Sequence, residues 1–318
     1  MNDGNGLSWR MIREAVTRIN GRVNHTPVLT SDTLDRFAGA SLFFKCENFQ
    51  KTGAFKARGA TNAIFALSAE AAGRGVVTHS SGNHAAAVAR AARLRAVPSH
   101  IIMPDNSVSA KVDSVKRYGG TVIFCAPNQT AREETADRII GETGAVLVHA
   151  YDDLHVMAGQ ATTGTELLEE VEDLDIILCP LGGGGHLSGI SVAAKTLKPS
   201  IRVFGVEPAG ADDAARSLAK GEIIPSVDPQ TIADGLRSSL GERPFREIQR
   251  YTDGILTVSE EAIIAAMRQL WEILKIVVEP SAAVAYAAIL ERKLPIEGRK
   301  VGIVLTGGNL DLDKLPWA

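Results

Sequence analysis

The chain has 318 residues, with 34 Lys and Arg side chains against 37 Asp and Glu, and a formal net charge of −3. This length allows a large core and about two domains, while the near-balanced charge predicts neither a nucleic-acid surface nor an acidic tail. No apolar run approaches the roughly 18 residues that span a membrane. A polar N-terminus without a signal-peptide core and three scattered cysteines, read as buried reduced thiols, favour a cytoplasmic protein with a small-molecule partner.

The first predicted helix begins after Ser8, a good N-cap residue, and ends near Gly21. An apolar strand-like segment at 42–46 then leads into a polar loop, and a helix-compatible segment begins close to Lys56. Beyond Gly75 the pattern alternates, with strands predicted at 76–80, 100–103, 121–125 and 146–148 and helices at 84–94, 110–118 and 130–143. Strands separated by helices of this length need crossover connections, so a parallel sheet is predicted.

The same alternation resumes after Tyr151. Helices are predicted at 159–170, 189–197, 259–274 and 281–292, and strands at 175–180, 202–208 and 301–305. The predicted fold class is therefore α/β, with parallel-rich sheets flanked by helices. Composition alone reveals no domain boundary, and the chain contains no repeat, low-complexity tract or long linker.

Lys56 is a candidate nucleophile at the N-terminal end of its predicted helix. It follows Phe55, lies among small residues and has Arg58 nearby, so partial desolvation and a like charge can lower the pKa of its amine. An amine of this kind can form a Schiff base. On spacing alone, an ordinary surface lysine at a helix start is the more frequent explanation.

Four consecutive glycines, 182–185, follow a buried strand and precede a helix. Without any Cβ, their backbone N–H groups can close around a phosphate at the positive end of the helix. No GK[ST] follows, so the run is not a Walker A loop. Glu207 ends the next strand, where a ribose-binding acid would lie; because the spacing is not GxGxxG, a nicotinamide-dependent oxidoreductase is kept as an alternative.

The sequence SSGNH at 80–84 forms a second candidate loop, between a strand and a helix. Its exposed N–H groups suit a carboxylate, although alone the motif would be an N-cap serine followed by a turn. The seven histidines include no HExxH motif and no local cluster with cysteine, so a zinc hydrolase has no support.

Five segments occur in order along nearly the whole chain: FQKTGAFKARGA around Lys56, SSGNH at 80–84, GGGG at 182–185, EPAGADD at 207–213 and TGGN at 306–309. Together they resemble the pyridoxal-phosphate (PLP) enzymes of fold type II, the tryptophan-synthase-β-like group, and most of all its serine/threonine dehydratase and serine racemase branch. The resemblance implies a small α/β domain at 71–149 inserted into a large PLP-binding domain formed by 1–70 and 150–318. It also implies an active site in the cleft between them, a homodimer, and no appended regulatory domain.

By this resemblance, Lys56 holds PLP through a Schiff base. The implied cofactor residues are Phe55, Lys56, Asn83, Gly182, Gly183, Gly184, Gly185, His186, Gly235, Glu279 and Thr306. Asn83 would bond the 3-oxygen of the cofactor and Thr306 its pyridine nitrogen. A hydroxyl cannot keep that nitrogen protonated as an aspartate would, which favours prompt β-elimination over reactions that need a long-lived carbanion.

The resemblance also implies substrate and metal residues. The implied substrate residues are Ser80, Ser81, Gly82, Asn83, His84, Arg132 and Tyr151. Ser81 aligns with the serine that serine racemases use catalytically on the cofactor face opposite the lysine, so racemisation is permitted. Glu207, Asp213 and the Ala211 carbonyl match a divalent-cation site, and such oxygen ligands suit Mg²⁺, Mn²⁺ or Ca²⁺.

The resulting hypothesis is an ammonia-lyase. A β-hydroxy amino acid would displace Lys56, which would then remove the α-proton, and loss of the hydroxyl would lead to a 2-oxo acid and ammonia. Arg132 could bind a second carboxylate bidentately. With Tyr151 and the ending TGGNLDLDKLPW, it makes the chain look most like 3-hydroxyaspartate dehydratases; serine or threonine ranks next and serine racemase third. Asp32 and Ala86 depart from the ATP site of serine racemases, so no nucleotide activation is expected.

Overall fold

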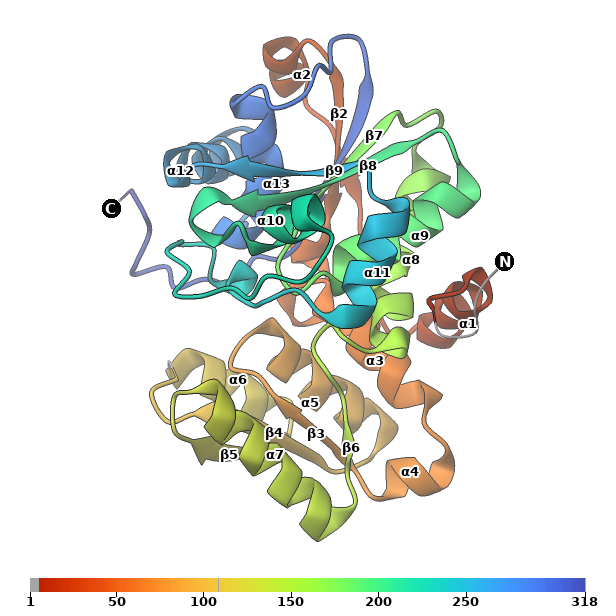
Figure 1. Cartoon of the computed structure of the whole chain (residues 1–318), viewed down its shortest axis with the longest axis vertical. Coiled ribbons are helices and arrows are strands. Elements are labelled where there is room, and N and C mark those ends of the chain that lie inside the picture. Colours follow the sequence, from red (N-terminus) through yellow and green to blue (C-terminus); the bar gives the residue numbers. More distant parts are fainter. Residues whose placement is uncertain (1–5, 108, 318) are drawn as a thin grey trace.

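The computed structural model describes residues 6–107 and 109–317, apart from the side chain of residue 110. Two separate sheets organise these residues, with α3 (Lys56–Ala66) running between them (Figure 1). No helix in these two ranges is both long and apolar enough to cross a membrane. The N-terminal stretch on which the absence of a signal peptide was predicted lies partly in residues 1–5, outside the described residues.

The larger sheet has six strands, and all but its first pair run parallel. Its order is β1 (Val28–Leu29), β2 (Ser41–Cys46), β10 (Lys300–Leu305), β7 (Ile176–Pro180), β8 (Arg202–Pro208) and β9 (Gly254–Val258). Strands β7 and β10 are buried along almost their whole length, as strands of a parallel sheet with helices on both faces should be. Because β2, β7, β8 and β10 run in the same direction, their carboxyl ends meet at one edge, where the predicted site residues follow.

The smaller sheet has four parallel strands. Its order is β5 (Thr121–Cys125), β4 (Ser99–Pro104), β3 (Val76–His79) and β6 (Val146–Leu147). All four fall within 71–149, the range predicted for the inserted domain, while the larger sheet takes strands from both sides of that range. The parallel-rich α/β fold is confirmed; the domain boundaries themselves stay a prediction.

Helices cover both sheets (Figure 1). Those on the side of the larger sheet, packed on it or on one another, are α1 (Trp9–Ile19), α2 (Asp32–Ala38), α8 (Leu154–Glu170), α9 (Gly185–Leu197), α10 (Asp213–Lys220), α11 (Glu242–Tyr251), α12 (Glu260–Gln269) and α13 (Pro280–Leu290). Those around the smaller sheet are α4 (Ala69–Gly73), α5 (Asn83–Arg95), α6 (Ser109–Arg117) and α7 (Gln129–Thr143). Ser8 caps α1 by accepting from the Met11 N–H, as predicted.

Several predicted boundaries are wrong. α8 begins five residues before Gly159, because the Asp153 side chain caps it, and α9 begins at Gly185, inside the glycine run. The helix predicted at 259–274 ends at Gln269 and continues as a π-turn, Leu270–Leu274. Of the three cysteines predicted to be buried, Cys125 lies on the edge strand β5 and is only partly buried.

Helix α3 meets α8 at a point where two glycines touch. A Cβ on Gly159 would lie 2.6 Å from the Cα of Gly59, and a Cβ on Gly59 would lie 2.8 Å from the Val156 carbonyl oxygen, so neither position accepts a side chain. On another side, α3 packs against α5 of the smaller sheet, and Ala60, Ala63 and Ile64 join that core. The helix that begins with Lys56 is thus held by both halves of the molecule.

Candidate active site

Lys56 is the first residue of α3, and its side chain is half-buried. The amine donates a hydrogen bond to the Ala150 carbonyl oxygen at 2.8 Å. Burial lowers the pKa of the amine to about 8. The predicted desolvation is therefore present, but the predicted contribution of Arg58 is wrong, because burial accounts for the shift and the Arg58 guanidinium is bound to carboxylates elsewhere.

The residues just before Lys56 are tied to the end of β10. The Phe55 N–H donates to the Thr306 carbonyl oxygen at 3.0 Å, and Ala54 forms an isolated antiparallel bridge with Gly307. Thr306 is buried directly beyond the strand. The structure therefore brings Thr306 and Lys56, 250 positions apart in the sequence, to the same edge of the larger sheet.

The glycine run lies in close contact with its surroundings. Gly184, with a φ of 87°, occupies the N-cap position of α9, which has no side-chain cap, so the first N–H groups of that helix are open to an anion. A Cβ on Gly183 would collide with the Tyr151 ring, and one on Gly185 would lie 2.7 Å from the Tyr151 carbonyl oxygen. Gly235 also reaches this run, since a Cβ on Gly182 would lie 3.3 Å from its carbonyl oxygen.

Two sets of contacts connect Lys56 with the glycine run, one stacking and one through Ala150 and Tyr151. The Phe55 ring stacks on His186, with centroids 3.9 Å apart and planes 5° apart, and His186 directly follows Gly185. Ala150, which accepts from the Lys56 amine, precedes Tyr151, whose ring covers Gly183. The lysine and the glycines are therefore neighbours in the fold.

Asn83, the first residue of α5, bonds across to the larger sheet's side of the molecule. Its amide Nδ2 donates to the carboxylate of Glu279 at 3.0 and 3.3 Å, and its Oδ1 accepts from the Asn309 amide at 2.9 Å. Glu279 is buried, and burial, with Asp234 adding to it, raises the pKa of its carboxyl to about 7. These contacts join the predicted residues Asn83 and Glu279, although 196 positions separate them.

The loop 80–84 is a turn between β3 and α5, as predicted. Ser80, Ser81 and Gly82 are half-buried, and a Cβ on Gly82 would meet open space. His84 is buried instead: one ring nitrogen lies 3.0 Å from the Val148 carbonyl oxygen and the other has no partner. Burial lowers the pKa of His84 to about 3, so the ring is neutral near pH 7.

Arg132 stands on α7 beside a row of aromatic rings, in which the predicted residue Tyr151 is joined by His79 and His149, which were not predicted. His79 packs edge-on against His149, and His149 packs edge-on against Tyr151, with centroid distances of 6.0 and 4.6 Å. The charge of Arg132 contributes to lowering the pKa of His79, after burial and against the opposing effect of Glu133. The Arg132 side chain is half-buried, and its Nε has no partner.

Glu207 and Asp213 are two neighbouring buried carboxylates. Glu207, on β8, accepts from the Ala215 N–H at 2.7 Å, and Asp213 opens α10 with a buried Oδ2 that lacks a partner. Burial first, and then the neighbouring Asp213, raise the pKa of Glu207 to about 8; burial also raises that of Asp213. Ala211 is buried in the turn between them. A hard cation would supply the missing positive charge.

Comparison with known proteins adds the class of protein. Residues 19–307 match the family described as "Pyridoxal-phosphate dependent enzyme". The chain belongs to this family of PLP-dependent enzymes. The nicotinamide alternative is therefore dropped, because a PLP site accounts for the glycine run and for Lys56 together.

Two curated relatives are similar to this PLP-dependent enzyme over most of their length. A serine racemase from Oryza sativa subsp. indica is 50% identical over 309 residues, covering 96% of this chain and 91% of the relative. A beta-hydroxyaspartate dehydratase from Paracoccus denitrificans is 48% identical over 300 residues, covering 94% and 95%. The solved structure of maize serine racemase matches with a TM-score of 0.94 and 48% identity, covering 96% of this chain and 94% of the other.

PLP fits the residues present in this family member. The open end of α9 after four glycines is a cradle for a phosphate, and the half-buried amine of Lys56 lies beside it. The additional residues His79 and His149 had a sequence signal that was overlooked: each lies at or shortly after the carboxyl end of a strand of the smaller sheet, one position before Ser80 and two before Tyr151.

Proposed function

We propose that this chain is a PLP-dependent ammonia-lyase that removes water from a β-hydroxy amino acid, with 3-hydroxyaspartate as its best substrate. The observation that carries the substrate choice is Arg132, a half-buried guanidinium with a free Nε next to His79 and the predicted substrate loop. Such a group can bind a second carboxylate that serine and threonine lack. The dehydratase from Paracoccus, with 48% identity, supports the same choice.

Lys56 is the residue that moves the proton. Bound PLP supplies an electron-accepting ring that stabilises negative charge at the substrate α-carbon. Because burial lowers the pKa of the Lys56 amine to about 8, a sizeable neutral fraction is present slightly above neutral pH, and a neutral amine can accept the α-proton. The hydrogen bond to Ala150 fixes the direction in which the amine points.

The other residues bind and orient. The turn 80–84 offers backbone N–H groups and serine hydroxyls to the α-carboxylate, while Arg132 takes the β-carboxylate. The side chains of Phe55, Asn83, Glu279 and Thr306 would border the cofactor, with Gly182 to Gly185 around its phosphate, Gly235 beside Gly182, and His186 behind Phe55. Thr306 offers a neutral hydroxyl to the pyridine nitrogen, which suits elimination.

A divalent cation completes this proposal. Glu207, Asp213 and the Ala211 carbonyl would hold Mg²⁺, Mn²⁺ or Ca²⁺, as the orphaned Asp213 oxygen suggests. The Asp213 charge also raises the pKa of Tyr151, after burial and Asp152, so the cation site lies within electrostatic reach of the glycine run. The cation would hold that side of the active site in place. The proposal also includes the homodimer that the family resemblance implies.

The substrate assignment is tested by ammonia release from 3-hydroxyaspartate isomers, L-serine and L-threonine, with and without Arg132→Gln. We expect this variant to lower kcat/KM for 3-hydroxyaspartate roughly 100-fold, the loss typical of a charge-assisted pair, while leaving serine turnover within a few-fold. Arg138→Gln, on the same helix but exposed and paired with Glu142, is the matched control. Turnover of L-threonine equal to or better than that of every hydroxyaspartate isomer would remove the first choice.

A racemase is the second candidate, because Ser81 is half-buried in the turn where a proton donor opposite Lys56 would stand, and because of the serine racemase relatives. Chiral analysis of L-serine incubated with the enzyme separates the two activities. Conversion to D-serine that exceeds ammonia release, and that disappears in Ser81→Ala, would make racemisation the main reaction.

A further inference from the structure

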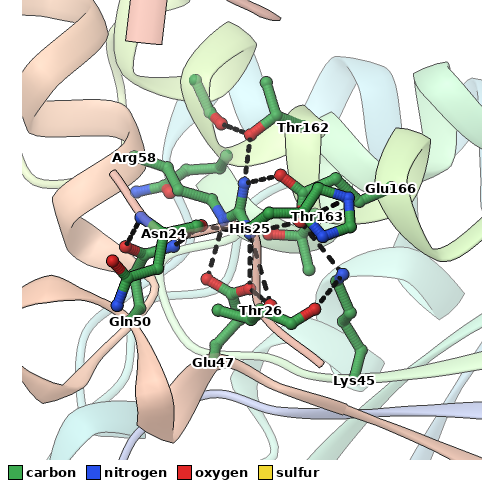
Figure 2. Close-up of polar contacts among 12 residues, drawn as sticks. Asn24, His25, Thr26, Lys45, Glu47, Gln50, Arg58, Thr162, Thr163 and Glu166 are labelled. Atoms are coloured by element: carbon green, nitrogen blue, oxygen red, sulfur yellow. Dashed lines mark hydrogen bonds and ion pairs between the residues drawn. The ribbon is translucent and has the colours of Figure 1, made fainter. Parts of the chain in front are cut away.

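Arg58 is among the largest fully buried side chains in the described residues, and all five of its N–H groups have an acceptor. Its Nε and Nη2 donate to the two oxygens of Glu47 at 2.7 and 2.8 Å, and its Nη1 and Nη2 donate to the two oxygens of Glu166 at 2.6 and 2.7 Å. The fifth N–H reaches the Thr162 hydroxyl at 3.0 Å. Figure 2 shows the guanidinium between these acceptors.

We infer that this double bidentate pair makes Arg58 a positioning residue for Lys56, two residues earlier in the first turn of α3. The inference rests on the proposed role of Lys56. Its basis is geometric: Glu47 follows β2 and Glu166 lies on α8, so one side chain fixes the start of α3 against two other elements. Residues two apart on a helix point in directions about 200° apart, so holding Arg58 on one side turns Lys56 to the other, toward Ala150.

The backbone before Lys56 is tied to β10 and the Gly59 N–H donates to Gln160 at 3.3 Å, but neither contact uses a side chain of the first turn of α3. Its N-cap residue, Phe55, makes no side-chain cap, and the turn contains no acidic residue. A cation in the first turn opposes the helix dipole, so Arg58 would be unfavourable there without Glu47 and Glu166. The contact between Gly59 and Gly159 sets how closely α3 approaches α8, but glycines cannot set the rotation of the helix; the guanidinium can.

Glu47 and Glu166 also compensate the positive charge of Arg58, which reduces its effect on the Lys56 amine. The titratable groups that face Lys56 from other elements are His84 on α5, His149 after β6 and His186 on α9. Burial lowers the pKa of each ring, so all three are neutral near pH 7. If Glu47 and Glu166 did not neutralise Arg58, its charge two residues away would lower the pKa of the Lys56 amine further.

A second buried cation, Lys45, joins this network and already binds two carboxylates that could otherwise hold a metal ion. His25, Glu166 and Glu170 lie close enough to hold a metal ion. However, the buried Lys45 amine already lies 3.0 Å from Glu166 and 2.6 Å from Glu170, and it also donates to the Thr26 carbonyl oxygen. Three carboxylates, Glu47, Glu166 and Glu170, therefore face two fixed cations, and the group is an ion-pair network around Arg58.

The test uses the full chain with pyridoxal 5'-phosphate as the probe. Covalent adducts are trapped with borohydride at a series of pH values, and the peptide that carries Lys56 is quantified by mass spectrometry. Glu166→Gln leaves the positive charge of Arg58 less compensated, so the midpoint pH of trapping should fall by roughly one unit. Arg58→Lys keeps the charge but loses the bidentate geometry, so the adduct should form more slowly at an unchanged midpoint.

Glu170→Gln is the matched control, because Glu170 lies one turn further along α8 and contacts Lys45 but not Arg58; it should leave both readouts unchanged. Glu166→Gln and Arg58→Lys behaving as the wild type, in folded protein, would overturn the inference. If Glu166→Gln does not fold, the rate of Arg58→Lys decides. Acylation of the Lys56 amine by a small reagent, without the probe, gives the pH midpoint of that amine independently. A chain that fails to bind the probe would therefore contradict the proposed function, while the acylation midpoint still tests this inference.

Discussion

Two groups of buried carboxylates in this protein differ in one respect: whether a cation faces them. Glu47 lies against Arg58, which outweighs the effect of burial and holds the pKa of Glu47 below its ordinary value. Glu207 faces Asp213 instead, and burial together with that like charge raises the pKa of Glu207 to about 8. Both carboxylates are almost fully buried, at 0% and 1% exposure, so burial alone does not decide the direction.

The comparison teaches what each group is for. A buried carboxylate that forms a bidentate pair with a guanidinium has its charge compensated, and in that sense the group is complete. Such a pair contributes to holding secondary-structure elements together. Two buried carboxylates with an orphaned oxygen are incomplete without a positive charge. By the inference above, the first group belongs to the scaffold beneath Lys56; under the proposed function, the second would hold a cation.

Removing the cation from the complete group should have the largest effect on stability. Arg58→Met leaves Glu47 and Glu166 buried without their partner, which we expect to lower the free energy of unfolding by about 3–5 kcal/mol. Urea unfolding at neutral pH, followed by circular dichroism, measures this difference.

Arg268→Met is the control for that variant. Arg268, near the end of α12, forms an exposed ion pair with Glu272 in the π-turn that follows. An exposed pair contributes only about 0–1 kcal/mol. Equal losses in the two variants would mean that the buried network around Arg58 stabilises the fold no more than an exposed ion pair does.

The incomplete group should respond to cations and to pH. Without a cation, Glu207 holds its proton to a higher pH in the folded state than in the unfolded state, so its contribution to stability is present below about pH 4.3 and is lost as pH rises through about 8. Mg²⁺ should restore stability most at the alkaline end, because binding needs both carboxylates deprotonated. At 100 times its dissociation constant, it would add about 2.7 kcal/mol.

Thermal melts across this pH range, in chelator and in excess Mg²⁺, check the prediction. Glu207→Gln should remove both the loss at alkaline pH and the gain from Mg²⁺, whereas Glu222→Gln, at an exposed position, should change neither. A wild-type melting temperature at pH 8 that is the same in chelator and in Mg²⁺ would rule out the cation site.

The elements of the fold that could be predicted are those with strong local signals. The buried strands β7, β8 and β10 each contain a run of apolar residues and glycine, and Ser8 marks the start of α1. Strand β9 was missed because four of its five residues are only half-buried, which weakens the apolar pattern. Charged helix α11, whose sequence is ERPFREIQRY, was missed because few of its residues are apolar.

The candidate site divides in the same way. Lys56 and the glycine run were predictable because both stand at helix starts, where local rules apply. The partners of Arg58 were not, since Glu166 is 108 positions away and no spacing rule connects them. Asn83 and Glu279 entered the prediction through family resemblance; that they bond to each other follows only from the way in which the two sheets are brought together.

His25, at the exposed edge of the network around Arg58, should contribute least to the free energy of unfolding. His25 is exposed, with 62% of its side chain in solvent, and its Nε2 lies 3.5 Å from Glu170 and 4.0 Å from Glu166, both of which already contact the Lys45 amine. His25→Gln should therefore lower the free energy of unfolding by no more than about 1 kcal/mol, and added salt should shrink the difference. Urea unfolding at low and high salt measures it. A loss as large as that of Arg58→Met would show that the network depends on the imidazole, and that two buried cations do not suffice for its three carboxylates.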